Sequence, residues 1–177
     1  YYGGRFKVAR QGEGLRFRLF GRLNQEMGQF TVRPELDGPW LVLHIEQISE
    51  ELPSLVYPPH LDVHSLILPS GLGQWVRKES YGCQFMTQSG LTMRWFGGLK
   101  ADANNGIMAI YEDGMADSGL YAKGLWVAPA WLKSMKKWAP TRSIRYRCVT
   151  GGYVGMAKVF RQYAIDHGFF RTLREKI

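Results

Sequence analysis

Long apolar runs are missing from this sequence, and cysteines are few. No stretch approaches the roughly 20 consecutive apolar residues that a membrane-spanning helix needs, so such a helix is excluded. The two cysteines, Cys83 and Cys148, lie far apart and match no metal-ligand spacing. Each stands in an alternating stretch, which is typical of a buried free thiol rather than a disulfide. The cellular compartment therefore stays open.

Acidic residues are scarce relative to basic ones, with 15 acids against 23 lysines and arginines and a net charge of +8. A basic protein first suggests nucleic acid as its partner. Here the positive residues are dispersed, and in the stretches 15–19 and 144–148 they alternate with apolar residues. Such alternation is typical of the solvated face of a half-buried sheet. The pattern favours a solvated face over a nucleic-acid site.

Signatures of cofactor and metal binding are also missing. The segment 69–74 lacks a third glycine at the dinucleotide spacing, and no phosphate-binding lysine motif occurs. The segment 102–106 has its glycine one position too early for a calcium-binding EF-hand loop. His60 and His64 stand four apart, but Pro58-Pro59 before them disfavours a helix that presents both rings on one face. We therefore infer no cofactor and no metal, and assign no catalytic residue.

Carboxylates and tryptophans are the remaining candidates for chemistry. Glu112, Asp113 and Asp117 cluster after a strand-like stretch, and paired carboxylates are what glycoside hydrolysis requires. Acids in loops are more often solvated turn formers, and we favour that interpretation. Indole rings stack on sugars, but they also fill sandwich cores, which is the simpler expectation for each tryptophan. The tryptophans are Trp40, Trp75, Trp95, Trp126, Trp131 and Trp138.

Up to about residue 150 the sequence has the two-residue periodicity of β-strands. In 15–19 apolar residues fall at every second position and line one face, whereas 40–45 is apolar on both faces and should be covered on both sides. Further strands are expected at 5–10, 64–68, 84–86, 91–96, 107–111 and 120–127. Asn105-Gly106 predicts a type I′ turn joining 91–100 to 107–112, because both residues accept positive φ. So many short strands predict a sandwich of antiparallel sheets.

The periodicity becomes that of an amphipathic helix after Gly151-Gly152. Its apolar face would consist of Tyr153, Met156, Ala157, Phe160, Tyr163, Ala164 and His167. We expect helix over about 152–167, ended by Gly168 in a left-handed conformation. Thr172 and Glu175 then have the capping-box spacing that announces a new helix. Because the two residues after Glu175 cannot sustain a helix, we expect the natural chain to continue past Ile177.

Several motifs in the second half of the chain resemble a known group of enzymes. They are Trp95-Phe96-Gly97-Gly98-Leu99-Lys100, Gly106-Ile107-Met108-Ala109-Ile110-Tyr111-Glu112-Asp113, Gly151-Gly152-Tyr153-Val154-Gly155-Met156-Ala157-Lys158 and Phe160-Arg161-Gln162-Tyr163-Ala164, followed by Gly168. In this order they are similar to the domain preceding the catalytic barrel in glycoside hydrolases related to families 101 and 129, which include α-N-acetylgalactosaminidases. The resemblance covers roughly residues 90–177.

The resemblance implies a mainly β, antiparallel β-sandwich of the galactose-mutarotase-like type over residues 1–150. Residues 151–177 would be a helix and linker leading towards a catalytic barrel that carries the catalytic carboxylates. Carbohydrate would be bound through the parent enzyme, and Trp95, before the expected Gly97-Gly98 bend, is our candidate for touching substrate. Alternatives are a stand-alone carbohydrate-binding module and, less favoured, a basic nucleic-acid-binding β domain. We expect no membrane partner.

Overall fold

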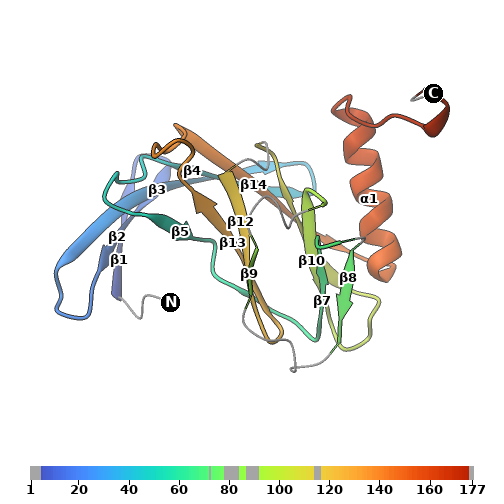
Figure 1. Ribbon diagram of the computed structural model, residues 1–177, viewed down its shortest axis with the longest axis horizontal. Coiled ribbons are helices and arrows are strands. Elements are labelled where there is room, and N and C mark those ends of the chain that lie inside the picture. The colour runs from blue at the N-terminus through green and yellow to red at the C-terminus, as the bar shows by residue number, and fades with distance from the viewer. Residues whose placement is uncertain (1–4, 72, 78–83, 87–91, 114–116, 176–177) are drawn as a thin grey trace.

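The computed structural model describes residues 5–71, 73–77, 84–86, 92–113 and 117–175, and Figure 1 shows their arrangement. The larger sheet has the strand order β1-β2-β3-β4-β14-β11-β10-β7-β8. Its strands are β1 (Arg5–Gln11), β2 (Gly14–Phe20), β3 (Glu26–Asp37), β4 (Trp40–Glu46), β7 (Ser65–Leu68), β8 (Gln74–Val76), β10 (Trp95–Leu99), β11 (Gly106–Tyr111) and β14 (Thr141–Val149). The smaller sheet has the order β5-β13-β12-β9, with β6 paired to β13. Its strands are β5 (Ser54–Val56), β6 (Leu61–Asp62), β9 (Gln84–Met86), β12 (Ser118–Lys123) and β13 (Trp126–Leu132).

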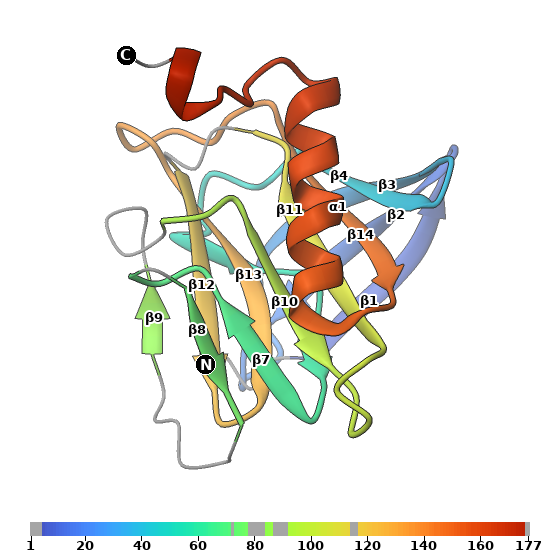
Figure 2. The same cartoon turned by 90° about the vertical axis from the view of Figure 1, so that its right-hand side faces the viewer.

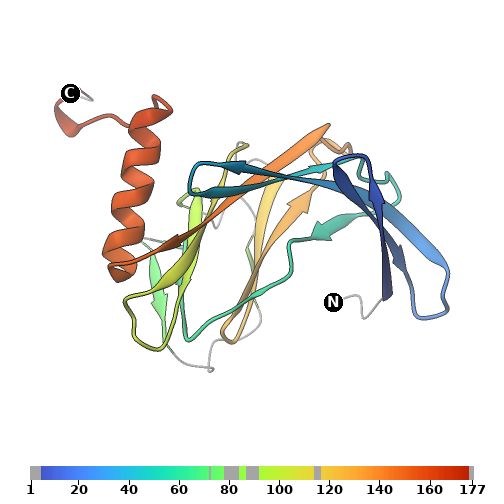
Figure 3. The ribbon, with the colours of Figure 1, turned by 180° about the vertical axis from the view of Figure 1, so that it is seen from behind.

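Neighbouring strands pair antiparallel, so the expected mainly β, antiparallel sandwich with a C-terminal helix is confirmed. The larger sheet arches over the smaller one (Figures 1 and 3). No helix in the described part of the chain is long and apolar enough to cross a membrane.

Two hydrophobic cores hold the molecule together. The first lies between the sheets, and Trp131, Tyr111 and Phe96 are among its fully buried side chains. The second lies on the outer face of the larger sheet, where helix α1 (Gly152–Asp166) crosses β10, β11 and β14 (Figure 2). Strand β4 contributes to both cores, with Trp40 under the helix and Ile45 between the sheets. The prediction that this strand is covered on both faces is therefore confirmed.

Glycines in β10 and β11 let α1 approach the sheet closely. A Cβ atom at Gly97 would lie 2.7 Å from the sulfur of Met156, and one at Gly106 would lie 2.7 Å from its methyl carbon. Met156 is fully buried in this space. The expected bend at Gly97-Gly98 is wrong, because both residues pair regularly with β7 and β11. These glycines provide close approach to a neighbour rather than a turn.

The helix begins at Gly152 and ends at Asp166, close to the expected 152–167. Gly168 has φ of 72°, which confirms the left-handed residue expected after it. The helix packs through Met156, Tyr163 and Ala164, but Tyr153 is half exposed and instead contacts the ring of Trp75. Beyond the helix, the Glu175 carboxylate accepts hydrogen bonds from the backbone N–H and the hydroxyl of Thr172, as the capping-box spacing predicts. The element that follows is the short 3₁₀ turn Leu173–Glu175.

The predicted hairpin exists, but its turn differs from the expected one. Strands β10 and β11 pair from Leu99↔Gly106 onward, so Gly106 belongs to the strand and the loop is 100–105. Neither Asn105 nor Gly106 has positive φ, whereas Ala103 has φ of 53°. Asp102 organises the loop by accepting hydrogen bonds from the backbone of Asn104 and Asn105, each at 2.9 Å. This side-chain capping replaces the type I′ turn.

Two further local expectations need correction. The stretch 120–127 is not one strand, because the chain turns at Gly124, with φ of 57°, between β12 and β13. Cys148 carries a free thiol as expected, but it is exposed. Along that face of β14 burial decreases from Ile144 to Tyr146 to Cys148, so the thiol lies beyond the covered part. Cys83 lies outside the described residues.

Candidate functional site

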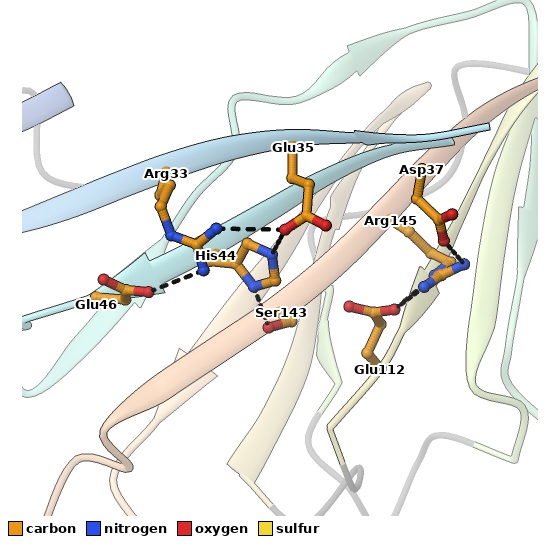
Figure 4. Close-up of polar contacts among 8 residues, drawn as sticks. All are labelled: Arg33, Glu35, Asp37, His44, Glu46, Glu112, Ser143 and Arg145. Carbon is orange, nitrogen blue, oxygen red and sulfur yellow. Dashed lines mark hydrogen bonds and ion pairs between the residues drawn. The ribbon is translucent and has the colours of Figure 1, made fainter. Parts of the chain in front are cut away.

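Charged side chains gather on the outer face of the larger sheet, beside helix α1. Side chains at every second position of a strand share a face, and this rule places polar residues of β3, β4 and β14 next to one another. Figure 4 shows two groups of linked side chains: the first consists of Arg33, Glu35, His44, Glu46 and Ser143, and the second of Asp37, Glu112 and Arg145. Ser143 lies opposite His44 in the register between β14 and β4. Residues far apart in the sequence therefore lie on the same face of the sheet.

Arg145 is the centre of the second group and is only 7% exposed. Its Nε donates a hydrogen bond of 2.6 Å to Glu112, and a second nitrogen also pairs with that carboxylate. A third nitrogen lies 3.4 Å from the carboxylate of Asp37. The guanidinium also stacks over the rings of Trp40 and Tyr163, at 5.3 and 4.9 Å from their centres. The charge of Arg145 is thus compensated on several sides.

His44 links two strands through both ring nitrogens. Its Nε2 lies 3.0 Å from Glu35 and its Nδ1 lies 3.0 Å from the hydroxyl of Ser143. Because an ionised carboxylate can only accept, Nε2 carries a proton. The hydrogen bonds from His44 and Arg33 hold the pKa of Glu35 below its usual value. Glu35 therefore remains an acceptor for both side chains.

The three acids after β11 are fixed to β14 rather than solvated, which corrects our interpretation of them as exposed turn formers. Glu112 pairs with Arg145, Asp117 lies 2.6 Å from the buried Arg142, and Asp113 accepts a hydrogen bond from the backbone N–H of Ser143. Arg145 is likewise buried, so the expected solvated face over 144–148 is wrong at this position, and Arg142, on the other face of β14, is buried as well. Paired acids compensate for the burial.

Asp113 is the exception in this group, because burial raises its pKa above the usual value. The hydrogen bond from Ser143 and the charge of Arg142 oppose this shift without cancelling it. A raised pKa is also a property of a general acid, but retaining hydrolysis needs a second carboxylate free to act as nucleophile. The neighbouring Glu112 is bound to Arg145 and is not free in this sense. The cluster therefore serves to hold β14 to Glu112, Asp113 and Asp117.

A cleft opens where Asp37 and Arg145 lie beside helix α1. It has a volume of about 530 Å³ and lies between the β3–β4 turn, β14 and the helix. Its lining residues are Asp37, Gly38, Pro39, Trp40, Arg145, Arg147, Lys158, Val159, Gln162, Tyr163, Asp166 and His167. Within the described residues, no group of three or more His, Cys, Asp or Glu side chains could hold a metal ion. The cleft offers cations, acceptors and aromatic rings, which suit a polar organic ligand.

The candidates from the sequence are spread over the molecule. Trp95 is 5% exposed and packs under the helix with its ring centre 6.1 Å from that of Phe160, so its contact with substrate stays a prediction. Trp40 and Trp131 are also buried, as expected for tryptophans in a core. His60 stacks on Trp126, with ring centres 4.4 Å apart. Of these five tryptophan and histidine positions, only Trp40 lines the cleft.

The cleft was not predicted from the sequence. Trp40 was assigned only to a core, and Arg145 and Arg147 only to a solvated face. A usable signal was present in the alternation of β14, because it places Arg145 and Arg147 on the face opposite Ile144. Helix α1 packs over that same face of the sheet. The turn that brings Asp37 and Trp40 beside it depends on β3, which the sequence analysis missed.

The fold is that of an antiparallel β-sandwich found within a glycoside hydrolase. The chain superposes on α-N-acetylgalactosaminidase NagBb from Bifidobacterium bifidum in its Gal-NHAc-DNJ complex, with a TM-score of 0.73 and 16% sequence identity. A quadruple mutant of NagBb gives a TM-score of 0.74 at 18% identity, and its GalNAc complex gives 0.73 at 19%. Each match covers 98% of this chain, which spans only 32% of the NagBb chain. No protein-family model and no curated protein sequence matches the chain.

The sequence resemblance to α-N-acetylgalactosaminidase-like glycoside hydrolases is thereby confirmed at the level of the fold. It also extends further than the motifs did, because the superposition includes the strand-rich first half as well as residues 90–177.

Proposed function

We propose that this chain is a non-catalytic β-sandwich domain of a glycoside hydrolase, related to the α-N-acetylgalactosaminidases. The observation that carries the proposal is the coverage of the structural match: nearly all of this chain corresponds to about a third of an enzyme of that class. The remaining part of such a protein would carry the catalytic barrel. Residues 1–150 would form the sandwich, of the galactose-mutarotase-like type, and residues 151–177 would lead towards the barrel.

The contacts of the carboxylates support the proposal that catalysis belongs to the barrel and not to this chain. Glu112 and Asp117 are paired with buried arginines, and Asp113 is bound to the backbone of Ser143. Retaining hydrolysis needs two carboxyl groups about 5–5.5 Å apart on either side of the scissile bond, one of them free to attack. The carboxylates of Glu112, Asp113 and Asp117 are occupied by contacts within the sandwich. The catalytic pair is therefore assigned to the barrel of the parent protein.

The work of the domain would be to buttress that barrel. A parent protein lacking residues 1–177 should be less soluble and melt at a lower temperature than the intact protein, because the surface that the sandwich covers becomes exposed to water. Thermal denaturation of the two proteins, followed by circular dichroism, measures this. A truncated protein with unchanged melting temperature and unchanged kcat/KM would contradict the supporting role.

Trp95 is the residue that we propose for contact with substrate in the parent enzyme. Its burial beneath Phe160, in the middle of α1, means that such a contact requires the helix to lie differently when substrate is bound. In the intact parent enzyme, Trp95→Ala should raise KM while the fold is retained. A folded Trp95→Ala enzyme with unchanged kinetics would remove Trp95 from the substrate site.

A stand-alone carbohydrate-binding module is the alternative, and two exposed indoles favour it. Trp75 and Trp126 are 38% and 40% exposed. Each already has a partner on its ring, because the guanidinium of Arg77 lies 3.8 Å from the Trp75 ring and His60 stacks on Trp126. A sugar would have to use the opposite faces. Saturable binding of neutral sugars that is lost in Trp126→Ala would support this alternative.

A further inference from the structure

The cleft beside α1 has two walls that carry polar groups at regular intervals. On the helix, Lys158, Gln162 and Asp166 are spaced by four residues and therefore follow one another along the same face. On the sheet, Arg145 and Arg147 lie two residues apart on the outward face of β14. The aromatic rings of Trp40 and Tyr163 form the base, with ring centres 6.2 Å apart. The cleft thus combines an aromatic, largely apolar base with polar groups on both walls.

Two of its cations have no acidic partner. Arg145 is compensated by Glu112 and Asp37 (Figure 4). In contrast, neither Arg147 nor Lys158 forms a salt bridge with any residue in the described ranges. The guanidinium of Arg147 is instead held over the face of Trp40, 5.6 Å from its centre. This stacking orients the guanidinium and leaves its donors available.

Hydrogen-bond acceptors lie along the same cleft. Asp166 lines it and accepts a hydrogen bond of 2.8 Å from the side-chain amide of Gln162. Asp37 lines it from the β3–β4 turn, where its carboxylate is 59% exposed and only loosely held by Arg145. Carboxylate and amide oxygens of this kind accept hydrogen bonds from hydroxyl groups. The ligand should therefore be negatively charged at one point and rich in hydroxyl groups elsewhere.

We propose that this cleft binds an acidic sugar, with its carboxylate at Arg147 and Lys158 and its hydroxyl groups at Asp37, Gln162 and Asp166. A planar guanidinium matches a carboxylate in a bidentate arrangement, and a lysine ammonium adds a second charge-assisted contact. The volume of about 530 Å³ is within the range of small-molecule sites and holds a monosaccharide unit. This site belongs to the chain itself, so it goes beyond the supporting role proposed above.

Binding to the 177-residue chain tests the proposal directly. Isothermal titration calorimetry is carried out with methyl β-glucuronide, with methyl β-glucoside as the neutral sugar of the same ring shape, and with acetate and inorganic phosphate as simple anions. We expect saturable binding of the glucuronide, at least tenfold stronger than that of the other three probes. Equal binding of the glucoside, or of acetate or phosphate, would overturn the assignment to an acidic sugar. Absence of saturable glucuronide binding would overturn the site.

Variants connect the binding to the cleft. Arg147→Gln and Lys158→Gln should each weaken glucuronide binding about tenfold or more, because each removes a charge-assisted contact. Arg161→Gln is the matched control, since Arg161 lies on the same helix outside the cleft and contacts Phe170. It should bind like the unaltered chain. Lys158 is exposed, so Lys158→Gln retains the fold even where Arg147→Gln, which removes a stacked side chain, does not. Unchanged binding by Lys158→Gln, or an equal loss by Arg161→Gln, would contradict the proposal.

Discussion

Individual charged side chains determine how strand β14 is held in this sandwich. Arg142 and Arg145 point to opposite faces of β14, and each is buried with an acid from the segment that follows β11. A buried charge without a partner is strongly destabilising, whereas a paired one is tolerated. The two arginines thus fix the position of Asp117 and Glu112. Both arginine–acid pairs should therefore contribute to the free energy of unfolding, and single substitutions measure each contribution.

Glu112→Gln should lower the free energy of unfolding by about 2–4 kcal/mol, because it leaves Arg145 with only the distant carboxylate of Asp37. Urea denaturation of the 177-residue chain measures the loss. Glu26→Gln is the matched control, since Glu26 forms a salt bridge with the solvent-exposed Arg18. A loss no greater than that of the control would show that the Arg145 pair does not hold the sheet.

The stability contribution of Asp113 should depend on pH. Burial raises the pKa of Asp113 in the folded state, so this carboxyl stabilises the fold below the unfolded pKa of about 3.9 and loses that contribution as pH rises through the folded pKa. Asparagine stays neutral. Asp113→Asn should therefore improve stability, relative to the unaltered chain, more at about pH 7 than at about pH 3.5.

Glu35→Gln should change stability with the opposite dependence on pH, and it serves as the control for Asp113→Asn. The pKa of Glu35 is lowered by His44 and Arg33, so its contribution is present above the unfolded pKa and is lost as pH falls through the folded pKa. Denaturation curves at both pH values provide the measurement for both variants. The same pH trend in Asp113→Asn and Glu35→Gln would be inconsistent with the burial of Asp113.

At the level of elements, helix α1 depends on a methionine above two glycines. Met156 fills the space over Gly97 and Gly106, and it is fully buried. Met156→Ala should cost about 2–5 kcal/mol in the free energy of unfolding, as for other large-to-small changes in a core. Val154→Ala, on the exposed side of the same helix, should cost less than about 0.5 kcal/mol. Chemical denaturation that gives equal losses would mean that α1 does not dock through Met156.

The elements that the sequence predicted are those with one clear periodicity. The helix bounds, β2, β4 and the β10–β11 pairing followed from patterns of two or of three and four residues. Strand β3 was missed, although Phe30 and Val32 alternate in it, because Gly28 and Pro34 interrupt a pattern that only tertiary pairing makes regular. The turn at 100–105 was misjudged because hydrogen bonds to Asp102 outweigh the preference of Asn-Gly for a tighter turn.

Of the candidate site, the sequence supplied residues but not their arrangement. Glu112, Asp113 and Asp117 were recognised as a cluster, yet their partners on β14 lie 25 to 33 positions later in the chain. The partner of the acids could not be inferred from local spacing, since it depends on which strand lies beside β11. The burial of Arg145 likewise follows from the packing of α1 over β14, which periodicity alone does not specify.

For the whole molecule, the sandwich has one outer face that is partly covered by α1 and partly polar. The basic residues are distributed over ion pairs, the cleft and exposed strands, as their dispersal along the sequence indicated. The fold matches about a third of an α-N-acetylgalactosaminidase, and Glu112 and Asp117 are engaged in ion pairs with buried arginines of β14. These observations support a domain that serves an active site located elsewhere in the parent protein.

Hydrolysis of an activated aryl α-N-acetylgalactosaminide is the measurement that tests this most directly. The purified 177-residue chain should show no turnover, whereas the parent chain extended past Ile177 should release the aryl group, because the free carboxyl pair that retaining hydrolysis needs is assigned to the barrel. Asp113→Asn, verified as folded by circular dichroism, accompanies the assay. Turnover by the 177-residue chain that disappears in Asp113→Asn would contradict the account and make this sandwich an enzyme in its own right.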